Sequence, residues 1–377
     1  MLLKLSSLLL LLCVRLLPLS AAAPNPAPAP VLVPGQIPLR VASAPPPGEP
    51  ISQDLFDELE ELSRIVDIAY CVGSMNTGVD KPFECLSFCR NFPSFELKQT
   101  WNTGLTLSDS CGYIALSHPP APPRIIVAFR GTYSIINALA DLSFAKQEYI
   151  PYPSKGHNAA TDKCDGCFVH TGFLESWSQT NSIISEVVGD LIKQYPDYAL
   201  TLVGHSLGGA VAALAGLDFS GRGWAPTVTT FGEPRIGNTE LAQFLNHRFT
   251  PDTFRRVTHR DDPVPLVPLT QWGYVQHGYE YYIAASQLPY SRCDIRLCDG
   301  DEDTTCVARG SANMLQLIWA HRDYFHRIGL CVPEDSFLRK IRLAAATEER
   351  ERLVDGVEAG YIRDGESTTC AKGRKEL

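Results

Sequence analysis

Residues 201–209 read Thr-Leu-Val-Gly-His-Ser-Leu-Gly-Gly, and this stretch decides the fold. Residues 201–203 are apolar or β-branched and predict a buried strand, whereas residues 207–218 are small and apolar and predict a helix. Between them lies a G-x-S-x-G sequence, which at such a junction is typical of a strained turn that exposes a serine hydroxyl. Ser206 is therefore the candidate nucleophile, and the alternative is an ordinary glycine-rich connection. We expect glycine at 204 and 208 because the two backbones pass too close there for a β-carbon.

The composition of the chain is that of a globular protein. The 377 residues are 45% hydrophobic and 20% charged, with a net charge of -9. This length allows one large domain or two small ones. Nothing in the charge balance indicates binding to nucleic acid.

The N-terminus predicts export. Residues 8–17 form an apolar run interrupted only by Arg15, and small residues follow, so a signal peptide over residues 1–22 is expected, with cleavage after Ala21 or Ala22. The run is too short to span a membrane well, and no later stretch reaches spanning length. Residues 23–50 are expected to form a linker or pro-segment, since ten of the 28 prolines lie within 24–50. We therefore predict a soluble, secreted, extracellular protein.

Strand and helix patterns alternate through the rest of the chain. Strands are predicted at about 124–129, 199–203, 228–231 and 254–258, and helices at 52–70, 173–195, 207–218 and 239–247. This alternation predicts an α/β fold with a mostly parallel sheet and helices on its faces. We assign residues 51–333 to this domain and residues 334–377 to a charged C-terminal extension.

A serine nucleophile needs a base and an orienting carboxylate, in the chain order serine, acid, histidine for this architecture. The strand at 254–258 leads into Asp261 and Asp262, and prolines fix the loop that follows. Asp262 is the preferred acid and Asp261 the second choice. The residues alone leave His321 and His326 open as the base. His205 precedes the nucleophile, so its side chain should point away from the hydroxyl, and we expect a structural role.

Two backbone N–H groups must also stabilise the oxyanion. One is expected from Leu207, the residue after the nucleophile. The other is expected from Thr132, where Gly131 permits a sharp turn toward the site.

Cysteine usage agrees with an oxidising compartment. Of the 12 cysteines, Cys13 lies in the signal segment, and the remaining number is odd, so at least one is unpaired or intermolecular. Cys164 and Cys167 form a C-x-x-C, for which a short disulfide loop is favoured over redox or metal chemistry because no second such pair follows at zinc-finger spacing.

Taken together and in this order, the motifs resemble the class 3 lipases, the filamentous-fungal triacylglycerol lipases with their feruloyl-esterase relatives. The resemblance runs over about residues 55–332 and is carried by segments 69–71, 129–132, 170–173, 204–209, 231–238, 256–259, 262–268, 278–282 and 321–325. It implies an α/β-hydrolase fold with a short helical lid, Asp262 as the acid and His321 as the base. It also implies the disulfide Cys71–Cys331 and the pair Cys164–Cys167. Further expected pairs are Cys85–Cys89 and Cys298–Cys306, which leaves Cys111, Cys293 and Cys370 without an assignment.

The family lid corresponds to residues 134–142, where one apolar face would be shared by Ile135, Ile136, Leu139 and Leu142. The alternative is a plain core helix. We expect a monomeric triacylglycerol lipase that acts at a lipid–water interface through an acyl-enzyme on Ser206, without metal or organic cofactor. The alternative is a feruloyl esterase, because residues 231–235 and 298–300 resemble that branch. A catalytically inactive binding relative is the minor alternative.

Overall fold

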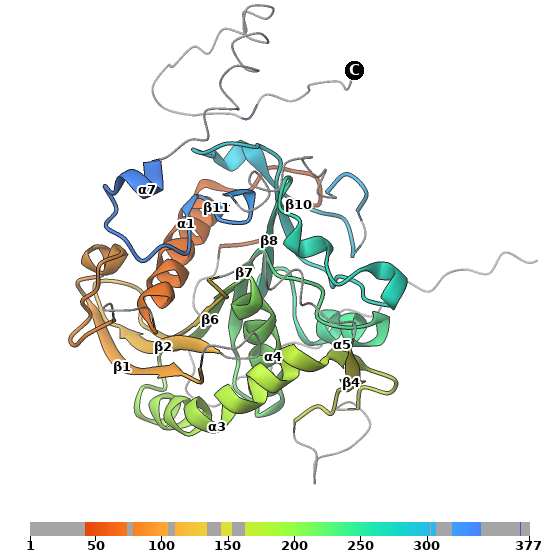
Figure 1. Cartoon of the computed structure of the whole chain (residues 1–377), viewed down its shortest axis with the longest axis horizontal. Helices are drawn as coiled ribbons and strands as arrows, with labels where there is room; N and C mark the ends of the chain where they lie inside the picture. Colours follow the sequence, from red (N-terminus) through yellow and green to blue (C-terminus); the bar gives the residue numbers. More distant parts are fainter. Residues whose placement is uncertain are drawn as a thin grey trace, which may run out of the picture.

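A computed structural model describes residues 42–73, 78–104, 110–133, 145–152, 163–301, 303–306, 319–340 and 370. Its centre is an eight-stranded sheet in the order β1-β2-β3-β6-β7-β8-β9-β10 (Figure 1). The strands are β1 (Phe95–Asn102), β2 (Cys111–Ser117), β3 (Arg124–Arg130), β6 (Ala199–His205), β7 (Thr227–Phe231), β8 (Phe254–His259), β9 (Glu280–Ile283) and β10 (Ile295–Leu297). Neighbours from β3 to β9 pair in parallel, whereas β1, β2 and β10 join antiparallel.

Helices cover both faces of this sheet (Figure 1). On one face lies α1 (Gln53–Ile68), capped by the Ser52 hydroxyl, which accepts a hydrogen bond from Leu55 N (3.2 Å). On the other face α4 (Leu207–Gly221) contacts β3, β6 and β7, and α3 (Thr171–Gln194) packs on α4. Two buried apolar clusters, one on each face, result from this arrangement. The remaining described helices are α5 (Thr239–Arg248) and the short α7 (Phe337–Lys340).

Short elements complete the fold. Two-stranded sheets are formed by β4 (Lys146–Glu148) with β5 (Phe168–His170), and by β11 (Asp323–Tyr324) with β12 (His326–Arg327). Single 3-10 turns lie at η1 (Ala69–Cys71), η2 (Phe88–Asn91), η3 (Val264–Leu266), η4 (Thr270–Trp272) and η5 (Arg292–Asp294).

The α/β expectation is confirmed, and so are the four predicted strands and four predicted helices, within a few residues at their ends. The sequence pattern did not predict the edge strands β1 and β10 or their neighbours β2 and β9. Strand β1 is half-buried and carries polar side chains, while β10 is only three residues long, so neither gives a sustained apolar run. The predicted lid residues Ile135, Ile136, Leu139 and Leu142 lie outside the described residues.

Five disulfides link the described chain, including the four pairs expected from the sequence: Cys71–Cys331, Cys85–Cys89, Cys164–Cys167 and Cys298–Cys306. The fifth, Cys293–Cys370, joins two of the three unassigned cysteines and ties the C-terminal extension to η5. The third, Cys111, is buried, and its thiol donates to Asn102 Oδ1 (3.0 Å). Among the described residues, no helix combines the length and hydrophobicity that crossing a membrane requires.

Candidate active site

Ser206 lies at the turn between β6 and α4 with φ 58° and ψ -129°, a conformation that L-residues rarely adopt. Glycine neighbours make the turn possible. A β-carbon on Gly204 would lie 2.1 Å from the Gly208 carbonyl oxygen, and one on Gly208 would lie 2.3 Å from that of Phe129. The Ser206 amide donates to the Phe231 carbonyl (2.9 Å), which ties the turn to β7. The local sequence therefore forces the serine into a strained, fixed position at the carboxyl edge of the sheet.

His321 and Asp262 form a fully buried pair at the same edge. His321 Nδ1 lies 2.9 Å from Asp262 Oδ1 and 2.8 Å from Oδ2, and both side chains are 0% exposed. The carboxylate also accepts from the Val264 amide (2.9 Å) and the Tyr324 hydroxyl (2.5 Å). These donors compensate the buried charge and fix its direction.

The other imidazole nitrogen points away from the acid. His321 Nε2 is buried and finds no hydrogen-bond partner among the described residues. The His321 ring lies 4.6 Å from that of His205, the residue before Ser206, measured between centroids. A β-carbon on Gly232 would lie 2.9 Å from His321 Cε1 and 2.8 Å from Asp262 Oδ2, so the backbone after β7 packs against both. An unpartnered buried nitrogen next to the elbow is suited to exchange a proton with the serine hydroxyl.

Two sequence alternatives lie elsewhere. His326 is half-buried beside α1, with Nδ1 3.2 Å from Ser63 Oγ, and desolvation of its ring lowers its pKa to about 3. Asp261 is half-buried, and its carboxylate lies 3.7 Å from Arg260 Nε. Neither side chain is part of the Asp262–His321 pair.

His205 connects the two halves of the site through buried hydrogen bonds. Its Nε2 lies 2.8 Å from the His321 carbonyl oxygen, which can only accept, so Nε2 carries the proton. Its Nδ1 therefore accepts from the Tyr70 hydroxyl at 2.5 Å. Burial, with the neighbouring His321, lowers the pKa of His205 well below its usual value and keeps it neutral. The side chain thus supports the backbone of His321, in keeping with the expected structural role.

The end of β3 passes directly over the serine. A β-carbon on Gly131 would lie 2.8 Å from Ser206 Cβ and 2.5 Å from the Tyr70 hydroxyl oxygen, which accepts from Gly131 N (3.2 Å). Thr132, the next residue, is half-buried. Leu207 follows Ser206 as the first residue of α4.

Tyr324 is the side chain at this site that the sequence pattern did not single out. Burial raises its pKa well above the usual value, so the hydroxyl stays protonated and donates to Asp262. The sequence offered a signal for this role, because Tyr324 lies between the two candidate bases, three residues after His321.

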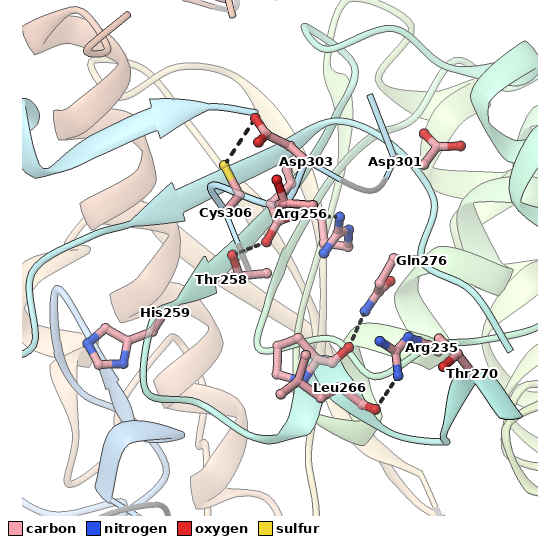
Figure 2. A pocket seen from close by; sticks show the side chains of 13 residues that line it. Arg235, Arg256, Thr258, His259, Leu266, Thr270, Gln276, Asp301, Asp303 and Cys306 are labelled. Carbon is pink, nitrogen blue, oxygen red and sulfur yellow. Dashed lines mark hydrogen bonds and ion pairs between the residues drawn. The ribbon is translucent and has the colours of Figure 1, made fainter. Parts of the chain in front are cut away.

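A cavity of about 250 Å³ borders the loop that follows Asp262 (Figure 2). It is bounded by Arg256, Thr258 and Glu280 of the sheet, and on the loop side by Gln276, whose Nε2 donates to the Pro265 carbonyl (2.9 Å). Ser206, Asp262 and His321 do not line it. The cavity is therefore separate from the candidate catalytic residues.

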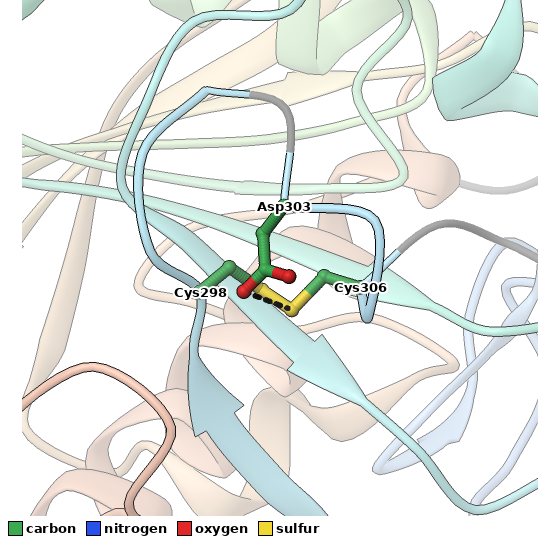
Figure 3. Close-up of side chains that lie close together, drawn as sticks. All are labelled: Cys298, Asp303 and Cys306. Atoms are coloured by element: carbon green, nitrogen blue, oxygen red, sulfur yellow. Dashed lines mark hydrogen bonds between the residues drawn. A yellow bond between two sulfur atoms is a disulfide. The ribbon is translucent and has the colours of Figure 1, made fainter.

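A cluster of Cys298, Asp303 and Cys306 has the spacing of a metal site, with its ligand atoms within 4.8 Å of one another. Figure 3 shows that the two sulfurs are bonded to each other in a disulfide. Asp303 Oδ1 instead accepts from Thr305 N (2.8 Å) and Oδ2 from Asp299 N (3.0 Å). Because thiolates are the metal-binding form of cysteine, this cluster acts as a loop closure.

The fold and edge geometry are those of a serine hydrolase built on an α/β sheet. The model of the class 3 lipase family matches residues 126–272. Secreted mono- and diacylglycerol lipase 2 of Gibberella zeae is 46% identical, over 77% of this chain and 85% of that protein. Lipase A of Sodiomyces alcalophilus is 43% identical, over 79% of this chain and 86% of that protein. The chain therefore belongs to the class 3 lipases and is a carboxylic ester hydrolase.

Solved structures agree. The Lip2 lipase of Yarrowia lipolytica superposes with a TM-score of 0.67 at 31% identity, over 75% of this chain and 97% of that one. The lipase of Rhizopus microsporus var. chinensis superposes with a TM-score of 0.61 at 29% identity, over 80% and 99%. All four of these relatives are named lipases, which favours the lipase expectation over the feruloyl-esterase alternative.

Proposed function

We propose that this protein is an exported acylglycerol lipase whose catalytic triad is Ser206, His321 and Asp262. The observation that carries the proposal is the buried Asp262–His321 pair beside a strained elbow serine, with one imidazole nitrogen left available. Asp262 holds the proton on Nδ1, so that Nε2 acts as the base.

The chemistry follows from this arrangement. His321 removes the proton from Ser206 Oγ while the oxygen attacks the ester carbonyl, and the N–H groups of Thr132 and Leu207 stabilise the oxyanion. The alcohol leaves with the proton from His321. Water then attacks the acyl-enzyme in the same way and releases the fatty acid. No step draws on a metal or an organic cofactor.

A lipid surface as partner is supported by exposed apolar side chains that follow the loop after Asp262. Leu269 and Trp272, at and near η4 after the acid loop, are 41% and 40% exposed. The Trp272 carbonyl accepts from Lys146 Nζ of β4 (2.5 Å), and the Tyr274 hydroxyl donates to the Ala145 carbonyl (3.1 Å). Ala145 and Lys146 therefore lie beside this exposed apolar pair. We infer that Leu269 and Trp272 contact the lipid surface.

Export and processing complete the proposal. A signal peptide over residues 1–22 and a Pro-rich segment over 23–50 precede the catalytic domain, and the charged extension follows residue 333. The disulfide-rich core and the secreted relatives support an oxidising, extracellular location.

The test is hydrolysis of tributyrin across its solubility limit, beside dibutyrin and methyl ferulate, with Ser206→Ala as the control. We expect a rate that rises above the limit, little turnover of ferulate, and loss of activity in Ser206→Ala. Comparing tributyrin with dibutyrin separates a triacylglycerol preference from a preference for partial acylglycerols, the substrates named for the Gibberella zeae relative.

Smooth saturation with ferulate preferred would contradict the lipase proposal. A second variant, Trp272→Ser, tests the lipid contact. Its activity on emulsified substrate should fall several-fold, while hydrolysis of a dissolved ester stays unchanged.

A further inference from the structure

In the described part of the C-terminal extension, Arg339 of α7 reaches back into the catalytic domain. Arg339 lies beyond residues 55–332, over which the family resemblance runs, yet only 5% of its side chain is exposed. Its Nη1 donates to the Arg327 carbonyl (2.7 Å), its Nε to the Val332 carbonyl (3.2 Å), and its Cζ lies 4.3 Å from the centroid of the Phe88 ring. We call the site formed by these partners, Phe88, Arg327 and Val332, the Arg339 socket, because it fixes the guanidinium in one orientation.

At the base of the socket lies Asp67, near the end of α1. Asp67 is fully buried, and its Oδ2 pairs with Arg339 Nη2 at 2.5 Å. Its Oδ1 accepts from the Gly329 amide at 2.6 Å, and the Ser87 hydroxyl donates to Oδ2. Within the described residues, Arg339 is the cation that forms an ion pair with Asp67. A buried carboxylate without such a partner is strongly unfavourable.

The socket belongs to the segment that carries the proposed base. Residues 321–331 begin with His321, form the β11–β12 hairpin and end at Cys331, which is bonded to Cys71. Within this segment, Arg322 Nη1 donates a hydrogen bond to the Gly329 carbonyl (2.7 Å). Arg339 donates a hydrogen bond to the Arg327 carbonyl, and Asp67 accepts one from the Gly329 amide. Two arginines therefore hold the hairpin, which contacts α1 through Ser63 and His326 and contacts α7 through Arg339.

We propose that Arg339 is a positioning residue for the hydrolytic reaction: by neutralising Asp67, it fixes the hairpin that places His321 and Tyr324 against Asp262. This inference rests on the proposed role of His321. The extension is then a working part of the catalytic domain, and its first turn is needed for full activity.

The experiment compares four full-length variants on a dissolved short-chain ester at 25 °C. Arg339→Met should lower kcat about ten- to a hundredfold with KM within twofold of wild type, since a small displacement of a base lowers the rate by that order. Adding Asp67→Asn to Arg339→Met removes the unpaired charge and keeps an acceptor for Gly329 N, so kcat should recover to within about fivefold. Arg339→Lys should be intermediate. The matched control is Phe337→Ser, whose side chain is 77% exposed, and no change is expected.

Amide hydrogen exchange of residues 322–331 provides a readout that does not depend on the chemistry. Exchange should be faster in Arg339→Met and restored in the double variant. Unchanged kcat with a lowered melting temperature, or unchanged exchange in this peptide, would overturn the proposal. Should Arg339→Met not fold, the same comparison is made between Arg339→Lys and the double variant. Failure of the triad itself is detected separately, as activity that survives Ser206→Ala.

Discussion

The elbow and the base-carrying hairpin meet at one edge of the sheet but are held there by different means. Ser206 is fixed by its neighbours in the chain, because Gly204 and Gly208 allow β6 and α4 to touch. The hairpin at 321–331 is fixed by distant partners: Cys71 is 260 residues away, and Asp67 is 262 residues from Gly329. The proposed nucleophile is thus positioned by local sterics, and the proposed base by long-range contacts that form only in the folded chain.

The largest expected effect comes from disrupting the local contacts that position Ser206. Gly204→Ala places a β-carbon 2.1 Å from the Gly208 carbonyl oxygen, and backbone atoms cannot move aside cheaply. We expect loss of folded protein, or at least about a thousandfold loss of activity, since overpacking of this severity exceeds the usual few kcal/mol. Circular dichroism and ester hydrolysis measure it. The control is Gly78→Ala, whose β-carbon would meet nothing closer than 3.9 Å. Near-normal activity in Gly204→Ala would contradict the steric account.

Removing the Cys71–Cys331 disulfide disrupts the long-range contacts that position the hairpin at 321–331. Replacing both cysteines by serine should lower the free energy of unfolding by about 2–5 kcal/mol, because the bond closes a long loop. Urea titration measures this loss. The matched control is the double serine variant of Cys85–Cys89, which spans four residues and should lose less. An equal loss of unfolding free energy in both variants would show that the long loop closed by Cys71–Cys331 gives no extra stability.

A smaller effect is expected for Tyr324→Phe, which removes one donor from the Asp262 carboxylate while keeping the ring. Hydrogen bonds to charged groups contribute about 1.5–3 kcal/mol. We expect kcat/KM to fall by about tenfold, measured with a dissolved ester. Wild-type kinetics in this variant would mean that Tyr324 does not orient the acid.

The last effect concerns stability alone and separates the two histidines that the residues alone left open. Burial lowers the pKa of His326 to about 3, against about 6.5 in an unfolded chain. Between these values the unfolded state binds a proton that the folded state does not, so stability is complete above pH 6.5 and declines as the pH falls toward 3. In His326→Gln, the loss of unfolding free energy from pH 7 to pH 5 should be smaller by about 2 kcal/mol. Urea titrations at both pH values measure it, and identical pH dependence in the two proteins would contradict this assignment.

The features that could be predicted from the sequence are those that depend on local contacts. The elbow, its glycines and the flanking strand and helix could be predicted because their causes lie within a dozen residues. Asp262 was preferred from the strand and prolines around it, whereas His321 could not be separated from His326 without the family resemblance. The difference between those two lies in what surrounds them after folding, with Asp262 beside one and Ser63 beside the other.

Asp67 and Arg339 could not be predicted for the same reason. A partial signal existed, because Asp67 lies among apolar residues 65, 66, 68 and 69, all of which are buried. Its partner lies 272 residues away, in a segment whose charges read as a solvated extension. A long-range ion pair leaves no local pattern in the sequence, so only the folded chain reveals it.

The most direct test of the central claim is the site of reaction with a p-nitrophenyl phosphonate, located by peptide mass spectrometry. We predict one adduct per chain, on Ser206, with none in Ser206→Ala and a labelling rate lower by about a thousandfold or more in His321→Ala. An adduct on another residue, or undiminished labelling without His321, would contradict the proposed triad.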